Sequence, residues 1–556
     1  MKDRIHDIVA TVLADRGARE VAFTVEYPAD IAHGDYAVNA AMVAAKTLGG
    51  KPREIAEKLS VALREALGAD ASSIEVAGPG FVNITLSQGA LLGELEEALA
   101  AGTAWGQGTA KKDTRVLIEY SNPNAFKEMH IGHLVGTIIG EALARLIENV
   151  GAVVARDTFG GDIGPNVAKA LWGLRHANGI EPTSAKEIGN AYVHGARAYE
   201  ESEKAKEEID ALNKAIYAGD DKELMDLWRK GRAVSVEEFR RLWQLLGTRF
   251  DFEFFDSDTT EIGMRTVQDG LAKGIFEKSD GAVIYNGEGK GVHTMVFITS
   301  HGTPTYEAKD IGLAFLKEER WPSDKVIIVS GTEQIGRFKT VLAALRELAP
   351  LVAAKTTHVP NGFLKLSSGK MSSRTGTVIT ASDLIQNVIA RVREKNDDPV
   401  VAGQVAVGAI KYMVLRQSPG ADIVFDSEQS LSLEGDSGPY LQYALVRARS
   451  VLRAVEEAGG TRDDAALTQD APAQPYEITR LITRFPDVAA RAEALLAPNI
   501  LTTYLTELAG AWNSFYAKER IVGGTYEAHK LSLARAFAAT MTNGLTLLGI
   551  PTPEKM

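Results

Sequence analysis

The stretch Glu119-Tyr-Ser-Asn-Pro-Asn-Ala-Phe-Lys-Glu-Met-His-Ile-Gly-His133 decides the fold of this chain, because a strand and a helix meet in it. The apolar run Val116–Ile118 before it predicts a buried strand, and apolar residues at helical spacing within Leu134–Leu146 predict a helix. Gly151 ends that helix, and Val153 begins a second strand. This order predicts a βαβ unit and, with it, a Rossmann-type parallel sheet in an α/β protein.

Two histidines, His130 and His133, stand where the predicted helix begins. A helix N-terminus presents free N–H groups and the positive end of the helix dipole, which favour phosphate. Glycine recurs at Gly132, Gly136 and Gly140, a flat stripe that would let the helix lie close to a sheet. Paired histidines at a helix start are most often surface or packing residues. The strand before them, the glycine-spaced helix after them and a matching loop far downstream favour a phosphate site instead.

Composition places the chain among ordinary soluble proteins with several domains. It has 556 residues, of which 45% are hydrophobic and 24% charged. The absence of cysteine excludes disulfides, thiolate catalysis and cysteine-based zinc sites. The N-terminus is too polar for a signal peptide, and no apolar run reaches the roughly 18 residues of a membrane span, so we expect a cytoplasmic protein. The net charge of −12 argues weakly against a nucleic-acid partner, although a local basic patch can override it.

The pattern of the chain predicts three domains. They are an N-terminal α/β module at 1–110, a Rossmann-type catalytic domain at 111–425 with a charged helical insertion at about 183–247, and an all-α domain at 426–556. Three later apolar runs are assigned to the catalytic sheet: Val296–Ile298, Val326–Val329 and Gly362–Leu366.

Polar residues collect where predicted strands and helices meet. The segment Val329-Ser-Gly-Thr-Glu-Gln334 ends a strand at the edge where open α/β sheets bind ligands. Tyr306 and Asp310 lie one turn apart at a helix start, and so on one face of that helix. The loop Gly369-Lys-Met-Ser-Ser-Arg-Thr-Gly376 is cationic and rich in hydroxyl groups, and can stabilise charge on a departing pyrophosphate. Taken singly, each feature would be an ordinary surface segment.

These motifs together resemble a known family. His130-Ile-Gly-His133 and Lys370-Met-Ser-Ser-Arg374 resemble the two signature motifs of class I aminoacyl-tRNA synthetases. Glu119-Tyr-Ser-Asn-Pro-Asn124, Thr305-Tyr-Glu-Ala-Lys-Asp310 and Gly435-Asp-Ser-Gly-Pro-Tyr-Leu-Gln-Tyr-Ala444 are similar to the arginyl-tRNA synthetases. The resemblance covers essentially the whole chain. It implies ATP-dependent formation of arginyl-adenylate and pyrophosphate, followed by transfer of the arginyl group to the 2′-hydroxyl at the 3′ end of tRNA(Arg) and release of AMP.

The resemblance also implies roles for individual residues. It assigns ATP binding to His130, Gly132, His133 and Met371, and catalysis to His130, His133, Lys127, Lys370 and Ser372. It places the substrate arginine among Glu119, Asn122, Asn124, Tyr306, Asp310 and Gln334. The chemistry agrees, because a guanidinium with five donors favours carboxylate and amide acceptors in a fixed geometry. Such a site can reject lysine or citrulline by roughly 10⁴ without editing, and no editing domain is evident.

One position departs from the motif of the class. Ser373 stands where the family's loop has a second lysine, and Thr375 stands where many relatives have another. Lys127, three residues before His130, is the candidate to replace the lost charge, and relatives carry a lysine there. We therefore assign Lys127 and Lys370 jointly to the phosphates.

Similarity to the family implies tRNA contacts at both ends of the chain. Phe81 and Asn83 match a module that reads a D-loop base, since stacking and an amide suit a splayed nucleotide. The anticodon surface is matched by Tyr443, Arg447, Tyr516 and Met556. Without the resemblance, Phe81 and Tyr516 would be interpreted as core aromatics.

The remaining expectations concern the metal, the assembly and the alternatives. Magnesium is expected with ATP, held by phosphates and water, and no protein ligand set for zinc or another metal is expected. A monomer is expected, with amino-acid activation that requires bound tRNA. The alternatives are another class I synthetase, for cysteine or glutamate, and a catalytically inactive tRNA-binding paralogue. The absence of cysteine and the paired acids speak against the first alternative, and the retained histidines and Lys370 speak against the second.

Overall fold

A computed structural model describes residues 1–28, 30–176, 181–367, 380–459 and 471–556. The chain forms two compact units. The larger consists of Gln107–Tyr443, Ala489–Thr506 and Leu545–Met556, and the smaller of Met1–Gly106, Ala444–Val488 and Glu507–Gly544.

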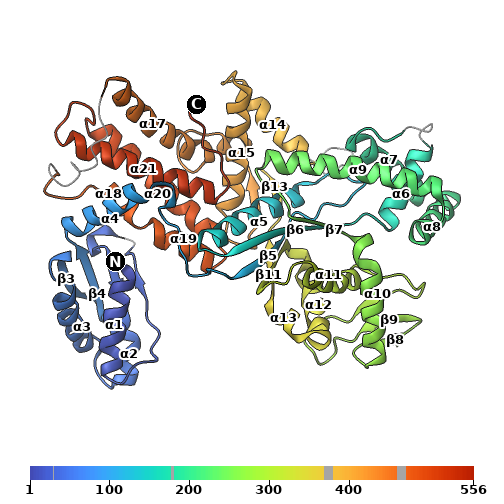
Figure 1. The fold of residues 1–556 in the computed structure, drawn as a ribbon, viewed down its shortest axis with the longest axis horizontal. Coiled ribbons are helices and arrows are strands. Elements are labelled where there is room, and N and C mark those ends of the chain that lie inside the picture. The colour runs from blue at the N-terminus through green and yellow to red at the C-terminus, as the bar shows by residue number, and fades with distance from the viewer. Residues whose placement is uncertain (29, 177–180, 368–379, 460–470) are drawn as a thin grey trace. The chain divides into compact units, whose positions relative to one another are not determined.

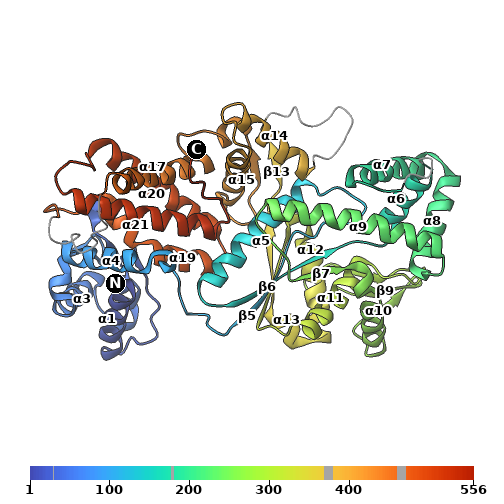
Figure 2. The same ribbon diagram turned by 45° about the horizontal axis from the view of Figure 1, so that its top comes forward.

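A five-stranded parallel sheet forms the centre of the larger unit, as the sequence predicted. Its strand order is β12-β11-β5-β6-β7, and all four neighbouring pairs are parallel. The strands are β5 (Arg115–Glu119), β6 (Val153–Gly160), β7 (Phe252–Phe255), β11 (Lys325–Gly331) and β12 (Thr356–Asn361). Figures 1 and 2 show α14 (Ala381–Arg393) and α15 (Pro399–Leu415) on one side of this sheet and α11 (Tyr306–Arg320), α12 (Ile335–Leu348) and α13 (Pro350–Lys355) on the other.

The predicted βαβ unit is confirmed, and α5 (Ile131–Asn149) is its helix. Side chains alternate along β5: Val116 and Ile118 join the core shared with α5, while Leu117 joins the core on the opposite face. A Cβ added to Gly140 would lie 2.2 Å from Cγ of Tyr120, so a glycine there lets the helix approach the chain beyond β5.

The charged stretch between β6 and β7 is helical, as expected. Its elements are α6 (Pro165–His176), α7 (Ala185–Glu201), α8 (Glu203–Ala218) and α9 (Lys222–Leu245). They share a small core of their own that includes Leu171, Ile188, Ile209 and Leu224. This core explains why a segment with so polar a surface folds into fixed helices.

Two of the three later strands do not join the parallel sheet, and that part of the prediction was wrong. β10 (Met295–Ile298) belongs to an antiparallel sheet with β8 (Glu277–Ser279) and β9 (Ala282–Tyr285). β13 (Leu364–Leu366) pairs instead with β14 (Ile423–Phe425). A short apolar run predicts a strand but carries no information about its partner. The strand that pairs with β11 at the edge of the parallel sheet is β12, whereas the sequence analysis had assigned the segment of β13 to this sheet.

Helices make up the rest of the larger unit and the C-terminal part of the chain. They are α10 (Asp256–Ala272), η4 (Thr332–Gln334), α16 (Ser427–Ser430), α17 (Gly438–Glu457), α18 (Glu477–Thr483), α19 (Phe485–Ala494), α20 (Pro498–Lys518) and α21 (Glu527–Leu547). The predicted helices Leu501–Tyr516 and Leu531–Leu548 correspond to α20 and α21.

The smaller unit contains an antiparallel sheet of order β1-β2-β4-β3. Its strands and N-terminal helices are β1 (Val25–Glu26), β2 (Tyr36–Val38), β3 (Ala71–Ala77), β4 (Phe81–Leu86), α1 (Lys2–Asp15), α2 (Ala40–Leu48), α3 (Pro52–Leu67), α4 (Gln88–Ala101) and the short helices η1 (Ile31–His33), η2 (Gly68–Asp70) and η3 (Gly102–Ala104). Asp35 is buried here, where it accepts hydrogen bonds from the Leu86 N–H and from the Arg480 guanidinium. The residue bounds of the three domains expected from the sequence remain a prediction.

Candidate active site

A cavity of about 510 Å³ lies where strands β5, β6, β11 and β12 end and helices α5, α11 and α12 begin. This is the edge at which parallel sheets bind ligands. All the residues assigned to the substrate arginine line this one cavity, together with three of those assigned to ATP: Glu119, Asn122, Asn124, Tyr306, Asp310, Gln334, His130, Gly132 and His133. Segments more than 200 residues apart in the sequence therefore contribute to a single site.

His130 caps the N-terminus of α5 with its own ring. Its Nδ1 accepts hydrogen bonds from the N–H groups of Gly132 at 3.0 Å and His133 at 3.4 Å. Two of the N–H groups that we expected to face a phosphate are therefore occupied. An Nδ1 that accepts leaves the proton of the neutral ring on Nε2. A Cβ on Gly132 would lie 2.9 Å from the ring of His130, so this glycine makes room for the cap.

The two imidazoles stack with ring centroids 3.6 Å apart. Burial, followed by the nearby charge of Lys127, lowers the pKa of His130. Burial lowers the pKa of His133 still further, and His130 and Lys127 add to that shift. Both rings are therefore neutral near pH 7 and carry no fixed positive charge.

Glu119, at the end of β5, is fixed by a buried lysine that the sequence analysis missed. Lys317 Nζ lies 2.5 Å from Glu119 Oε2 and 2.9 Å from Asp157 Oδ2, and all three side chains are at most 4% exposed. Lys317 follows Tyr306 and Asp310 at helical spacing on α11, so extending that helical face along the sequence could have found it.

Asn122 and Asn124 brace the loop that follows β5. Asn122 donates from Nδ2 to Glu119 at 2.8 Å and accepts from the Phe159 N–H at 2.9 Å. Asn124 accepts from the Gly161 N–H at 2.9 Å. Ser121 and Asn122 adopt φ angles of 75° and 51°, a conformation that is strained for residues with side chains. The two amides thus hold two loops of the site together.

Asp310 faces a second residue that the sequence analysis missed. Arg337, on the first turn of α12, places Nη1 3.1 Å from Asp310 Oδ2, and it also lines the cavity. Burial raises the pKa of Asp310 to about 7, an effect that the positive charge of Arg337 opposes. Arg337 lies three residues after Gln334, so its helical spacing from a predicted site residue was the available signal.

The structure describes only some of the residues predicted to act on the phosphates. Lys127 does not line the cavity: its Nζ lies 4.3 Å from the centre of the Tyr192 ring on α7. Lys370, Met371 and Ser372, together with Ser373, lie outside the described residues.

Two of the residues matched to tRNA binding are exposed aromatics in the smaller unit. Phe81 on β4 is 38% exposed and Tyr516 on α20 is 40% exposed, so the alternative interpretation as core aromatics was wrong. Arg447 lies 5.0 Å from the centre of the Tyr516 ring and donates to Asn513 at 3.2 Å. Asn83 is half-buried within β4. Tyr443 on α17 and the terminal Met556 are half-buried residues of the larger unit.

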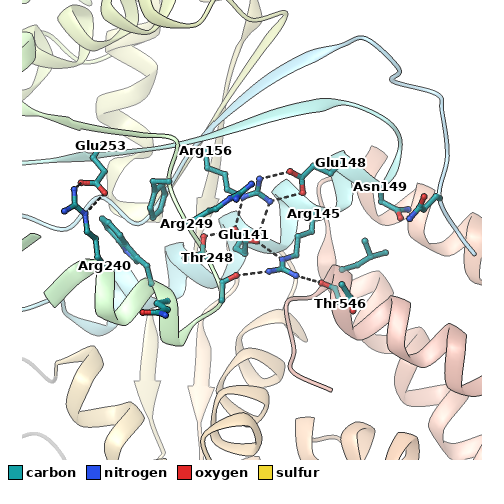
Figure 3. Close-up of a pocket in the computed structure, with 16 residues that line it drawn as sticks. Glu141, Arg145, Glu148, Asn149, Arg156, Arg240, Thr248, Arg249, Glu253 and Thr546 are labelled. Carbon is teal, nitrogen blue, oxygen red and sulfur yellow. Dashed lines mark hydrogen bonds and ion pairs between the residues drawn. The ribbon is translucent and has the colours of Figure 1, made fainter. Parts of the chain in front are cut away.

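A larger cavity of about 840 Å³ borders the other end of α5 (Figure 3). Glu141 lies between Arg145 at 2.6 Å and Arg156 at 3.0 Å, and Arg156 also pairs with Glu148 at 2.6 Å. Arg145 further donates to the carbonyl oxygens of Gly247 and Thr546. These charges are already matched within the protein, so the arrangement joins α5 to its neighbours and leaves little for a ligand.

Comparison with known proteins agrees with the geometry of the smaller cavity. Residues 94–427 match the model of the class I tRNA synthetase (R) catalytic domain, 441–556 the DALR anticodon-binding domain, and 2–86 the arginyl-tRNA synthetase N-terminal domain. The chain is 31% identical to the arginine–tRNA ligase of Treponema denticola, over 92% of this chain and 91% of that protein. It is 30% identical to that of Halothermothrix orenii, over 100% and 99%.

A solved structure supports the same relationship. The arginyl-tRNA synthetase of Thermus thermophilus is similar over the full length of both chains, with a TM-score of 0.82 and 27% identity. Among the described residues, no helix is long and apolar enough to cross a membrane. In the same part of the chain, no three His, Asp or Glu side chains are grouped to hold a metal ion. The chain belongs to the arginyl-tRNA synthetases, a family of class I aminoacyl-tRNA synthetases.

Proposed function

We propose that this chain ligates L-arginine to tRNA(Arg) at the expense of ATP. The observation that carries the proposal is one cavity that combines a histidine-capped helix start with two buried carboxylates, Glu119 and Asp310. Membership of the family supports the same activity and sets aside a synthetase for cysteine or glutamate.

The reaction has two steps. A carboxylate oxygen of arginine attacks the α-phosphorus of ATP, and the bond from that phosphorus to the bridging oxygen breaks, which releases pyrophosphate. The 2′-hydroxyl of the terminal ribose of tRNA then attacks the carbonyl carbon of arginyl-adenylate, and AMP leaves. Magnesium bound to the ATP phosphates and to water would neutralise part of their charge.

The chain's own residues bind and orient the reactants. His130, with its proton on Nε2, donates a hydrogen bond to a phosphate oxygen without adding a proton to the reaction. His133 and Gly132 shape the same surface, and Met371 contributes from the loop. Lys127 and Lys370 supply positive charge to the phosphates, and Ser372 supplies a hydroxyl. Lys127 must leave Tyr192 to do so.

The substrate arginine is recognised through its guanidinium group. Asp310 and Glu119 accept its N–H groups, with Tyr306 and Gln334 beside them, while Asn122 and Asn124 hold the loop that shapes the pocket. A lysine side chain offers one ammonium in place of a planar fork, so it leaves acceptors unpaired.

We also propose that tRNA is bound through both family-matched surfaces. Phe81 and Asn83 are matched to the first, and Tyr443, Arg447, Tyr516 and Met556 are matched to the second. The exposed rings of Phe81 and Tyr516 support stacking on unpaired bases. Lysine and arginine contacts with phosphates should make the binding strongly dependent on salt.

The experiment that tests the function is arginine-dependent exchange between ATP and pyrophosphate. It is run with and without total tRNA, and with lysine and glutamate as control amino acids. We expect exchange with arginine alone, and only when tRNA is present. Full exchange without tRNA would contradict the predicted dependence on tRNA. Exchange with another amino acid would contradict the assignment of the pocket, and tRNA binding without any exchange would indicate an inactive paralogue.

A further inference from the structure

The arginine pocket contains a guanidinium that belongs to the protein itself. Arg337 lies inside the cavity, and its closest charged partner is Asp310, the carboxylate assigned to the guanidinium of the substrate. The side chain of Asp310 is 9% exposed and that of Arg337 is 23% exposed. The carboxylate therefore has little contact with solvent, and Arg337 covers part of its remaining surface.

The contact between these two residues is an incomplete one. The closest approach is from Arg337 Nη1 to Asp310 Oδ2, at 3.1 Å, and that oxygen accepts no aligned hydrogen bond from a described residue, whereas an arginine can bind a carboxylate through two parallel hydrogen bonds. Arg337 Nε and Asp310 Oδ2 are both buried, and neither has an aligned hydrogen bond to any residue that the structure describes. A second guanidinium in better alignment would therefore gain more from Asp310 than Arg337 does.

We propose that Arg337 is an internal competitor of the substrate, which occupies Asp310 in the empty enzyme and is displaced when L-arginine binds. This inference rests on the proposed function, because it takes Asp310 as the acceptor of the substrate guanidinium. Two guanidinium groups cannot share one nearly buried carboxylate without repulsion, so displacement is the arrangement that the charges favour.

The site offers a place to which the displaced side chain can turn. Glu333 lies four residues before Arg337, where η4 leads directly into α12, and its exposed carboxylate also lines the cavity. Residues four apart on a helical turn are neighbours, so a rotation of the Arg337 side chain can exchange Asp310 for Glu333. The ion pair is thereby transferred to a more solvated position.

Internal competition has a measurable cost in affinity. If Arg337 holds Asp310 for about four-fifths of the time, the apparent Kd of every guanidinium ligand is raised about fivefold. The increase is the same for L-arginine and for agmatine, which is arginine without its carboxylate, because both would compete only at Asp310. A residue that bound the substrate carboxylate would instead affect L-arginine alone.

The test is calorimetric titration of the full chain with L-arginine and with agmatine, for the wild type and for Arg337→Gln. The titrations are done at pH 8.5. Asp310 is ionised in the wild type at this pH, because its pKa is about 7. We expect Arg337→Gln to bind both ligands roughly fivefold more tightly. Arg346→Gln removes an exposed arginine from the same helix and should leave both Kd values unchanged.

Other changes in the two Kd values would contradict the inference. Weaker binding of L-arginine with unchanged agmatine would show that Arg337 binds the carboxylate, and would overturn the inference. Unchanged or weaker binding of both ligands would overturn it as well. Asp310→Asn tests the pocket separately from the role of Arg337: strongly weakened binding of both ligands supports the pocket itself, whereas unchanged binding would refute the pocket and the inference together.

A pH series adds a readout that a purely structural role would not give. Glu119 on β5, Glu307 on α11 and Asp256 at the start of α10 raise the pKa of Asp310, and Arg337 is the nearby charge that opposes them. His358 on β12 is neutral, because burial lowers its pKa to about 4. Removing Arg337 should therefore move the pH dependence of ligand binding to higher pH. An unmoved profile would mean that Arg337 does not face Asp310 in solution.

Discussion

Two cavities border the same helix, α5, and they differ in how their charges are matched. At the C-terminal half of α5, Glu141 receives hydrogen bonds from Arg145, Arg156 and Thr248 (Figure 3). The Tyr120 hydroxyl also donates to Glu141. None of the residues lining this cavity, all of which the structure describes, has a buried polar side-chain atom without a partner. The cavity at the N-terminal end of α5 differs in this respect. Among the described residues, buried polar atoms that make no aligned hydrogen bond belong to His133, Asp310, Arg337 and Asn361, all within one cavity.

This difference distinguishes a structural site from a ligand site better than size does. The cavity with matched charges is the larger, at about 840 Å³ against about 510 Å³. A buried polar atom without a partner costs free energy, so folding alone does not favour a cluster of them. A ligand that supplies the missing partners gives the cluster a reason to exist. The comparison can be tested by changing one charge at each end of α5.

The largest effect is expected from Asp310→Asn. The substitution keeps the shape of the side chain but removes the charge that we propose receives the guanidinium, so kcat/KM for arginine should fall by roughly 10³ or more. The measurement is pyrophosphate exchange with tRNA present. Asp269→Asn, which changes an exposed carboxylate on α10, should retain full activity. Equal activity of the two variants would mean that the unpartnered atoms do not mark the substrate pocket.

At the opposite end of α5, Glu141→Gln should affect stability rather than substrate binding. It leaves the buried guanidinium of Arg156, which is 7% exposed, with a weaker partner, and breaking such a pair costs about 3 kcal/mol. Calorimetry should show a melting temperature lower by roughly 5 °C, with the KM for arginine unchanged. Glu148→Gln alters a carboxylate that is 41% exposed and should have a smaller effect. An increase in KM without a loss of stability would contradict the comparison.

Lys127→Ala tests whether the charge missing at Ser373 is supplied from beside α5. The kcat for activation should fall roughly 100-fold, because stabilisation of the charge on the leaving pyrophosphate is lost, while the KM for arginine changes little. Single-turnover measurement of adenylate formation separates this step from transfer to tRNA. Lys112→Ala, at an exposed lysine, serves as the control. An unchanged kcat would refute the assignment and leave Tyr192 as the structural partner of Lys127.

The sequence was a good guide where local pattern determines structure. The strand at Val116–Ile118, the helix that begins at the two histidines and the helix start at Tyr306 were predicted from periodicity and end signals, and the structure confirms each of them. The partners of β10 and β13 could not be obtained in this way. Strand pairing depends on which surfaces meet in three dimensions, and a run of three or four apolar residues leaves that open.

The same limit applies to the site. The resemblance to the family implied the carboxylates and amides of the site, and the acceptors that a guanidinium requires agree with that assignment. Lys317 and Arg337 were not predicted. A positively charged side chain is not expected in a pocket assigned to a guanidinium until the carboxylates that it pairs with are seen. Both lie at helical spacing from residues that had been predicted. Helical spacing indicates which residues share a face, but only the packed structure shows that the face borders the cavity.

The smallest effect is expected in the pH dependence of arginine binding. This dependence reports directly on the charge of Asp310 in the cavity at the N-terminal end of α5. Burial raises the pKa of Asp310 to about 7, and the guanidinium requires the ionised carboxylate. Affinity should therefore be fully present above pH 8 and should decrease as the pH falls through 7, by roughly tenfold between pH 8 and pH 6. The histidines should contribute less, because burial lowers the pKa of both rings below the ordinary value. Titration calorimetry across the series measures the effect, and residual binding to Asp310→Asn provides the control, since it should lose this dependence. A profile that persists in Asp310→Asn would assign the titration to another buried carboxylate, such as Asp157 on β6, whose pKa is also raised by burial.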